Sequence, residues 1–307
     1  MKHFFAFLFI FTVAMLPQQI SVEKVFPVTD YNDGAFFYPQ FSPDNKALLF
    51  SSEMYMGLWL YDLNFNSLSQ INNHIGSGYY PRFSPNGENI IYRVDAFVEK
   101  LKYSDLRLYS LVERTENLIF PQSRFLSEPF FVGESEIAFL RGSEVLAYNN
   151  LSKEASARVT SFPVAFVENS DLIIQQNGVK KTLNPLGKGN YIWVSLSPDN
   201  SIILFHLAGK GTFISDINGN VLHELGKAHA PQFSPDGNFV TFMLDSDNGQ
   251  FVTESKIFVY SLATKTKTEI AGGTGLIGMY PRWSSDGKRI TFNTADGLIY
   301  IIDLKID

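Results

Sequence analysis

Four polar residues recur at one position of a repeated phrase and have the chemistry to bind an anion. The residue that follows the proline of this phrase is Gln40, Arg82, Gln232 or Arg282. A guanidinium group forms two parallel hydrogen bonds with a carboxylate. Arg82 and Arg282 are therefore candidate ligand-binding residues, with Gln40 and Gln232 beside them. The alternative interpretation is that the arginines form structural ion pairs between neighbouring repeats.

Other patterns that could support chemistry are weaker. The histidines after the N-terminal segment, His74, His206, His223 and His229, do not have the close spacing of a metal motif, and a catalytic zinc ion usually needs three converging protein ligands. The sequence contains no cysteine and no Gly-x-Ser-x-Gly nucleophile motif. We therefore predict no catalytic residue, no metal ion and no cofactor.

The phrase around these residues defines an internal repeat. It reads Tyr-Pro-Gln-Phe-Ser-Pro-Asp-Asn from Tyr38, and it returns with small changes from Tyr80, Ala230 and Tyr280. Pro-Asp-Gly and Pro-Asn-Gly favour tight turns, because proline presets φ and glycine accepts positive φ. Short apolar runs follow each phrase, as expected for strands buried on both faces. Each unit is thus a small antiparallel sheet that must pack against its neighbours.

The spacing of the units predicts a β-propeller. Their prolines, or the equivalent positions, fall at 39, 81, 129, 164, 194, 231 and 281, a mean step close to the ~40–45 residues of a four-stranded blade. We expect seven blades, or six if the weak unit near residues 164–186 is not a true blade. The last unit supplies three strands, so residues 20–29 are expected to close the ring as its fourth strand.

The phrase resembles the repeat of the TolB-like, WD-type propellers, and the resemblance covers nearly the whole chain after residue 19. It implies a free-standing propeller, because the α/β domain of TolB and the hydrolase domain of the related peptidases have no counterpart here. One such fold hosts many functions. Some polysaccharide lyases with related repeats use histidine clusters, which keeps an enzymatic alternative open.

The connections between strands provide a second candidate surface. The tight turns vary little, whereas the opposite face carries the variable connections, on which function is often found. Methionine and tyrosine suit adaptable contact surfaces. The predicted partner patch consists of Met54, Tyr55, Met56, Phe97 and Tyr103. The alternative is that these side chains pack locally. We interpret Trp59, Trp193 and Trp283 as packing residues within strands.

The N-terminus predicts export. Lys2 and His3 precede an apolar run from Phe4 to Leu16, the pattern of a secretory signal peptide. We assign residues 1–19 to this peptide and residues 20–307 to a single propeller domain. An uncleaved membrane anchor is the alternative. The net charge of −6 argues against nucleic-acid binding, which usually needs a basic surface.

These patterns predict a non-enzymatic periplasmic or secreted propeller that binds a protein or peptide partner through one face and the channel mouth. The alternative is an enzyme of lyase or hydrolase type that acts on a polysaccharide or small ligand at the axis. The sequence identifies neither the partner nor the oligomeric state.

Overall fold

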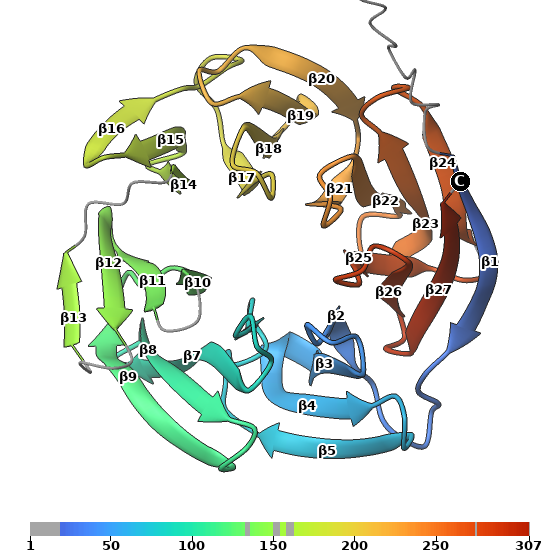
Figure 1. Ribbon diagram of the computed structural model, residues 1–307, viewed down its shortest axis with the longest axis horizontal. Helices are drawn as coiled ribbons and strands as arrows, with labels where there is room; N and C mark the ends of the chain where they lie inside the picture. Colours follow the sequence, from blue (N-terminus) through green and yellow to red (C-terminus); the bar gives the residue numbers. More distant parts are fainter. Residues whose placement is uncertain (1–18, 133–135, 150–153, 158–162, 274, 307) are drawn as a thin grey trace, which may run out of the picture.

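The computed structural model describes residues 19–132, 136–149, 154–157, 163–273 and 275–306. In these ranges the chain forms seven small antiparallel sheets arranged in a ring around a central axis (Figure 1). This is the predicted all-β propeller, and it has seven blades rather than six. The expected signal peptide lies outside the described residues except for Gln19. No helix in the described ranges is long and apolar enough to cross a membrane.

Blades are numbered from the first repeat, and their strands run outward from the axis. Blade 1 contains β2 (Phe37–Phe41), β3 (Ala47–Ser52), β4 (Met56–Asp62) and β5 (Ser67–Asn72). Blade 2 contains β6 (Arg82–Phe83), β7 (Asn89–Val98), β8 (Leu101–Ser110) and β9 (Thr115–Ser123). Blade 3 contains β10 (Phe130–Val132), β11 (Glu136–Arg141), β12 (Glu144–Asn149) and β13 (Glu154–Ala157). A short 3-10 helix, η1 (Glu53–Tyr55), joins β3 to β4.

The remaining blades follow the same plan. Blade 4 contains β14 (Val164–Glu168), β15 (Asp171–Gln176) and β16 (Val179–Thr182), and blade 5 contains β17 (Tyr191–Leu196), β18 (Ile202–Leu207), β19 (Gly211–Asp216) and β20 (Val221–Gly226). Blade 6 contains β21 (His229–Phe233), β22 (Phe239–Asp247), β23 (Val252–Ser261) and β24 (Lys267–Gly273). Blade 7 contains β25 (Gly278–Trp283), β26 (Arg289–Thr294), β27 (Ile299–Ile306) and β1 (Ile20–Pro27). The weak unit near residues 164–186 is a true blade, with three strands among the described residues.

The Ser-Pro-Asp-Gly turns form for a local reason. In blade 6, Ser234 donates its hydroxyl to Asp236 (2.5 Å) and accepts the backbone N–H of Phe239 (2.9 Å). Gly237 has a φ of 75°, which glycine adopts without steric cost. The turn therefore satisfies its own polar groups and sends the chain directly into the second strand.

The core is made between blades rather than within them. Leu49 and Leu58 of blade 1, for example, pack with Ile90 and Tyr92 of blade 2, and all four are fully buried. Since each sheet has two apolar faces, it needs a neighbour on both sides, and a closed ring provides one for every blade.

The N-terminal strand closes this ring. β1 pairs with β27 in antiparallel register from Ile20↔Ile306 to Pro27↔Tyr300, and Ile20 and Phe26 pack on the cores at the two sides of blade 7. Blade 7 thus combines both ends of the domain, as predicted.

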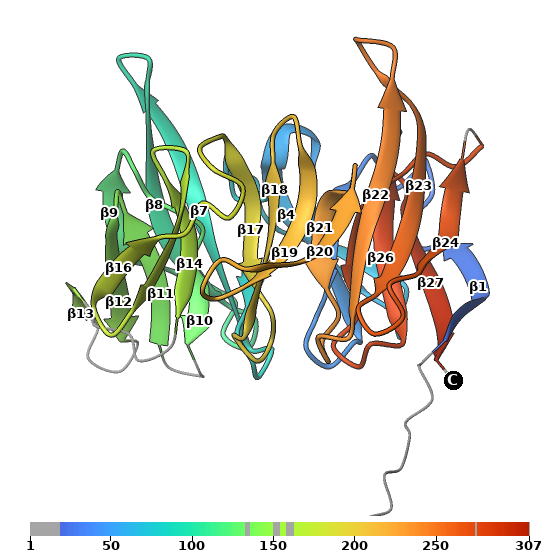
Figure 2. The same ribbon diagram turned by 90° about the horizontal axis from the view of Figure 1, so that it is seen from above.

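The two faces of the ring differ. The tight turns between first and second strands lie on one face, the turn face. The hairpins between second and third strands and the connections between blades lie on the other, the loop face. On the loop face the β7–β8 and β22–β23 hairpins project beyond the rest of the molecule (Figure 2).

Candidate functional site

The first strands carry a repeated distortion that faces the channel. In β2, β17, β21 and β25 the pairing with the second strand shifts register through a β-bulge, for instance between Phe37 and Gln40 and between Met279 and Arg282. A bulge adds a residue and redirects the side chains beside it. Here it turns the residue before the repeat's proline position toward the axis.

Five blades hold this residue in the left-handed backbone region. The residues and their φ values are Tyr38 (59°), Tyr80 (52°), Trp193 (51°), Ala230 (46°) and Tyr280 (55°). This conformation costs a residue with a side chain roughly 1–3 kcal/mol. Neighbouring blades support it: the side chain of Asn293 accepts the backbone N–H of Tyr38 at 3.0 Å. All five side chains line one cavity at the axis.

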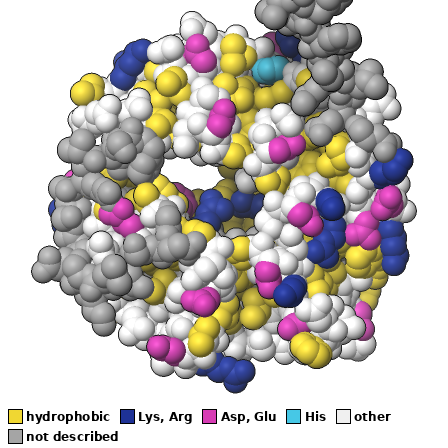
Figure 3. All heavy atoms as spheres, in the orientation of Figure 1, with side chains coloured by type: hydrophobic (Ala, Val, Ile, Leu, Met, Phe, Trp, Pro, Cys, Tyr) yellow, Lys and Arg dark blue, Asp and Glu magenta, His cyan; other side chains and the backbone are white. Residues whose placement is uncertain are grey.

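That cavity measures about 230 Å³ and lies at the loop-face end of the channel, since Tyr55, Gly78 and Tyr79 of the loop-face connections also line it. Gln40, Gln232 and Arg282 form part of its wall. In the space-filling view, positively charged and hydrophobic side chains gather inside the central opening (Figure 3).

The two predicted arginines converge on one tyrosine. The guanidinium carbon of Arg82 lies 5.9 Å from the ring centre of Tyr80, and that of Arg282 lies 5.5 Å from the same ring. Arg282 donates Nη1–H to Oε1 of Gln232 at 2.9 Å. Gln40 donates to the carbonyl of Pro81 at 3.0 Å. The repeat position thus places polar groups of blades 1, 2, 6 and 7 together.

Neither arginine has a carboxylate partner within ion-pair distance among the residues that the structure describes. The predicted alternative, a structural ion pair between blades, is therefore not what the described residues form. Burial, together with the like charge of Arg82, lowers the pKa of Arg282 to about 10. Burial also lowers the pKa of Arg82, while Tyr80 and Glu128 act in the opposite direction. Two cations share a poorly solvated site, and a bound anion would relieve their repulsion.

The aromatic wall stays uncharged. Burial raises the pKa of Tyr38, Tyr79, Tyr80 and Tyr280, so their phenols are neutral at physiological pH. Tyr55 stacks on Tyr38, with ring centres 4.5 Å apart. The cavity therefore offers flat apolar faces and neutral hydroxyls, together with the positively charged guanidinium of Arg282 in its wall.

A histidine–carboxylate pair lies beside this wall. His229 Nδ1 is 2.6 Å from Asp245 Oδ1, and the ring centres of His229 and Trp193 are 5.5 Å apart. The bond to Asp245 raises the pKa of His229 against the opposing effect of burial. Burial and the nearby His229 lower the pKa of His206, whose ring centre is 5.5 Å from that of His229.

Two sequence interpretations need correction at this point. The sequence predicts Trp193 as a packing residue, which is wrong, because its bulged strand turns it into the cavity. His206 and His229 lack the close spacing of a metal motif in the sequence, but adjacent blades place their rings side by side. The signal for the first was available, since Tyr38, Tyr80 and Tyr280 are aromatic at the same repeat position.

The predicted partner patch divides into separate parts. Tyr55 lines the cavity, whereas Met54 on η1 is 87% exposed and Phe97 on the β7–β8 hairpin is 63% exposed. Tyr103 on β8 is half-buried, and Met56 begins β4 at the surface. No ring contact among the described residues joins Phe97 or Tyr103 to the η1 segment. Whether these side chains bind a partner remains a prediction.

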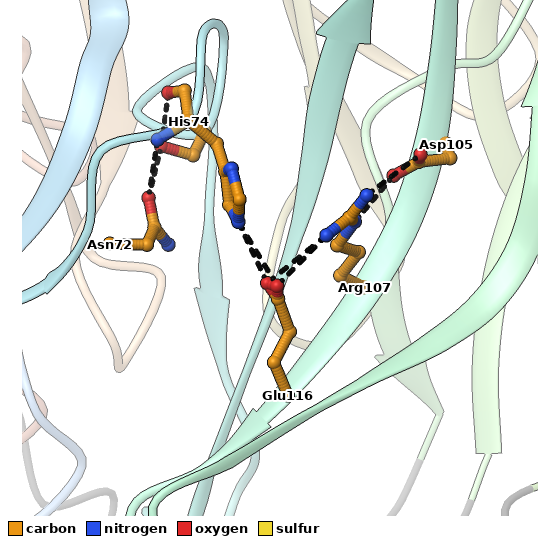
Figure 4. A network of polar contacts seen from close by, with 6 residues as sticks. Asn72, His74, Asp105, Arg107 and Glu116 are labelled. Atoms are coloured by element: carbon orange, nitrogen blue, oxygen red, sulfur yellow. Dashed lines mark hydrogen bonds and ion pairs between the residues drawn. The ribbon is translucent and has the colours of Figure 1, made fainter.

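A second polar cluster lies between blades 1 and 2, and its side chains form hydrogen bonds with one another (Figure 4). Glu116 accepts from His74 Nε2 at 2.8 Å and from Arg107 Nη1 at 3.0 Å, and Arg107 also donates Nε–H to Asp105 at 2.9 Å. Burial raises the pKa of Glu116, but the bonds from Arg107 and His74 outweigh it and lower the pKa overall. Both carboxylates of this cluster accept hydrogen bonds from Arg107, whereas neither axial arginine has an ion-pair partner among the described residues.

No protein-family model matches the chain, and no curated protein matches it. The fold is, however, similar to that of solved structures. An oligogalacturonate lyase in complex with manganese is similar with a TM-score of 0.65 and 14% identity, over 94% of this chain and 97% of that one. The oligogalacturonate lyase of Vibrio parahaemolyticus is similar with a TM-score of 0.63 and 12% identity, over 94% and 97%.

The likeness is one of fold. It confirms the propeller over nearly the whole chain, while membership of the TolB-like family stays a prediction. The described residues contain no group of three or more His, Cys, Asp or Glu side chains that could hold a metal ion. The residues of this site that the structure describes thus do not match a metal centre built from such ligands.

Proposed function

We propose that this protein binds a carboxylate-bearing sugar or oligosaccharide in the axial cavity. One observation carries the proposal: Arg82 and Arg282 converge on Tyr80 with no ion-pair partner among the described residues. A sugar acid supplies what they lack, a planar carboxylate that a guanidinium binds through two hydrogen bonds.

The remaining wall suits the rest of such a ligand. Trp193 and the tyrosines offer apolar faces on which a sugar ring can lie, and the half-buried glutamines Gln40 and Gln232 offer hydrogen bonds. The solved neighbours support this ligand class, because their names refer to oligogalacturonate, an oligomer of a sugar acid. Because of the N-terminal apolar run, we include export to the periplasm or cell exterior in the proposal.

The test is calorimetric titration of the protein with trigalacturonate. We expect binding by the wild type and a loss of about 10- to 100-fold for Arg82→Gln and for Arg282→Gln, because a hydrogen bond to a charged group contributes about 1.5–3 kcal/mol. The double charge reversal Arg82→Glu/Arg282→Glu should abolish binding. Arg114→Gln, at an exposed turn, is the matched control and should bind as the wild type does.

A peptide with a free C-terminus carries the same carboxylate without the sugar ring, so it forms the second arm of the titration. Binding of trigalacturonate alone supports the proposal. Binding of the peptide alone would replace it with the peptide-binding function. Equal affinity in the wild type and both arginine variants would overturn the site.

A second candidate function, β-elimination on the same ligand, is favoured by the His229–Asp245 pair beside Trp193. In this reaction a base removes the proton from the carbon that bears the carboxylate. The bond from the adjacent carbon to the leaving sugar's oxygen then breaks, and that oxygen takes up a proton. A carbon–carbon double bond remains in the product. Asp245 raises the pKa of His229 and so favours the protonated imidazole, the form that can donate a proton to the leaving oxygen.

The double bond formed by elimination is conjugated with the carboxylate and absorbs in the ultraviolet. Trigalacturonate incubated with the wild type should develop this absorbance if the protein is an enzyme, and His229→Gln should slow its appearance. Binding of trigalacturonate without any change in absorbance would contradict β-elimination and retain the binding function.

A further inference from the structure

One of the five left-handed positions around the cavity differs from the others. Tyr38, Tyr80, Trp193 and Tyr280 present large rings to the axis, whereas blade 6 presents only the methyl group of Ala230. The backbone is the same at all five, with φ between 46° and 59°. Blade 6 therefore has the same backbone conformation as the other blades but places no ring beside the cavity, where Ala230 is 9% exposed.

The surroundings of this position are polar and connected to the arginines. Gln232 lies two residues further along β21 and accepts the hydrogen bond from Arg282. His229, the preceding residue, pairs with Asp245. Trp193 of blade 5 and Tyr280 of blade 7 line the same cavity from the two neighbouring blades. Ala230 thus lies between two aromatic side chains of the cavity wall, on the strand whose Gln232 accepts a hydrogen bond from Arg282.

We propose that the gap at Ala230, between Trp193 and Tyr280, is the subsite that holds the sugar ring adjacent to the carboxylate, and that Ala230 sets the size of ligand the cavity accepts. This inference rests on the proposed function. The ring lies against Ala230 and packs on Trp193, and its carboxylate reaches Arg282. A ligand without a ring has nothing to fill this gap.

The decisive variant is Ala230→Tyr, because tyrosine already occupies the equivalent position of three other blades with the same backbone conformation. Trigalacturonate should bind this variant at least about 30-fold more weakly, since the phenol occupies the subsite. Ala230→Gly is the matched control: glycine accepts the positive φ and keeps the gap open, so its affinity should stay within about twofold of the wild type.

Circular dichroism and thermal unfolding establish that each variant is folded. If Ala230→Tyr does not fold, Ala230→Asn serves instead, because asparagine tolerates left-handed backbone and still adds bulk; it too should weaken binding. Wild-type affinity in a folded Ala230→Tyr protein would overturn the subsite. The arginine variants then decide the proposed function separately: their loss of binding would retain the axial anion site without a subsite at Ala230.

Discussion

At the scale of single residues, the site consists of side chains in costly states that support one another. Tyr80 occupies left-handed backbone and lies within cation–π distance of two arginines. Arg282 keeps its charge in a poorly solvated place, so that its pKa falls to about 10. Strain and uncompensated charge of this kind are usual at binding sites, because selection for function can offset the lost stability.

The Glu116 cluster predicts a pH dependence of stability. The pKa of Glu116 is lowered in the folded protein. The stabilisation of the fold by its carboxylate is therefore fully present above the unfolded pKa of about 4.3 and is lost as pH falls through the lower folded pKa. Glu116→Gln should cost about 1 kcal/mol at pH 7, a low value because Glu116 and His74 are 24% and 32% exposed. Urea unfolding of both proteins between pH 7 and pH 3 measures this difference.

The difference between wild type and Glu116→Gln should shrink steadily below pH 4, because the wild-type carboxylate also becomes neutral there. Glu224→Gln, an exposed change on β20, should show no such dependence. A cost for Glu116→Gln that stays constant down to pH 3 would contradict the role of the charge.

At the scale of elements, the strands of a blade differ in burial and in role. Second and third strands are mainly buried and hold the blades together, as Phe205 on β18 and Ile257 on β23 illustrate. First strands are short, and those of blades 1, 5, 6 and 7 are bulged and present cavity residues. Outer strands are largely exposed and close the sheets. Blade 4 has no outer strand among the residues that the structure describes.

β1 gives the element-scale prediction. Val28 donates its N–H to Ile299, so by alternation Lys24 donates inward to β27 while the N–H of Val25 points outward. Lys24→Pro should therefore destabilise the protein by about 1–3 kcal/mol, because it removes a ladder hydrogen bond. Val25→Pro should be tolerated, as Pro27 already is at the other outward position. Thermal unfolding of the two variants provides the comparison, and equal losses would contradict the assigned register.

At the scale of the whole molecule, the closed ring is what brings the site together. Arg82 and Arg282 come from blades 2 and 7, which become near neighbours at the axis only after blade 7 has met blade 1. β1 and β27 hold this junction by sharing one sheet. Closure thus links global stability to the geometry of the cavity.

Circular permutation tests this role of the shared blade. Ile20 and Ile306 are register partners, so a short glycine linker can join the two ends. New ends between Gly187 and Lys188 fall between blades, whereas new ends between Asn218 and Gly219 fall within blade 5. The first permutant should be less stable than the second by more than about 1 kcal/mol, the net value of one hydrogen bond, since no blade contains both of its ends.

Urea unfolding followed by circular dichroism gives the two free energies of unfolding. Both permutants should form the same sheets, because every blade keeps its strands. Equal stabilities would mean that packing alone closes the ring and that the shared blade adds nothing.

The fold could be predicted from sequence because its signals are local. The turn at Ser234–Gly237, the apolar run after it and the repeat interval each involve only neighbouring residues, and together they specify strands, blades and closure by residues 20–29. The repeat also placed Gln40, Arg82, Gln232 and Arg282 at equivalent positions, from which a common location near the axis follows.

Tertiary structure alone decided which of these residues meet and in what environment. The approach of Arg82 to Arg282 depends on the summed rotation of the blades between them, which no local pattern contains. The bulges turned Trp193 into the cavity, and the packing of blade 5 on blade 6 brought His206 to His229. That neither arginine forms an ion pair with a described residue, although Glu128 is near enough to raise the pKa of Arg82, is likewise a property of the assembled channel, because burial and charge depend on residues that are distant in the chain.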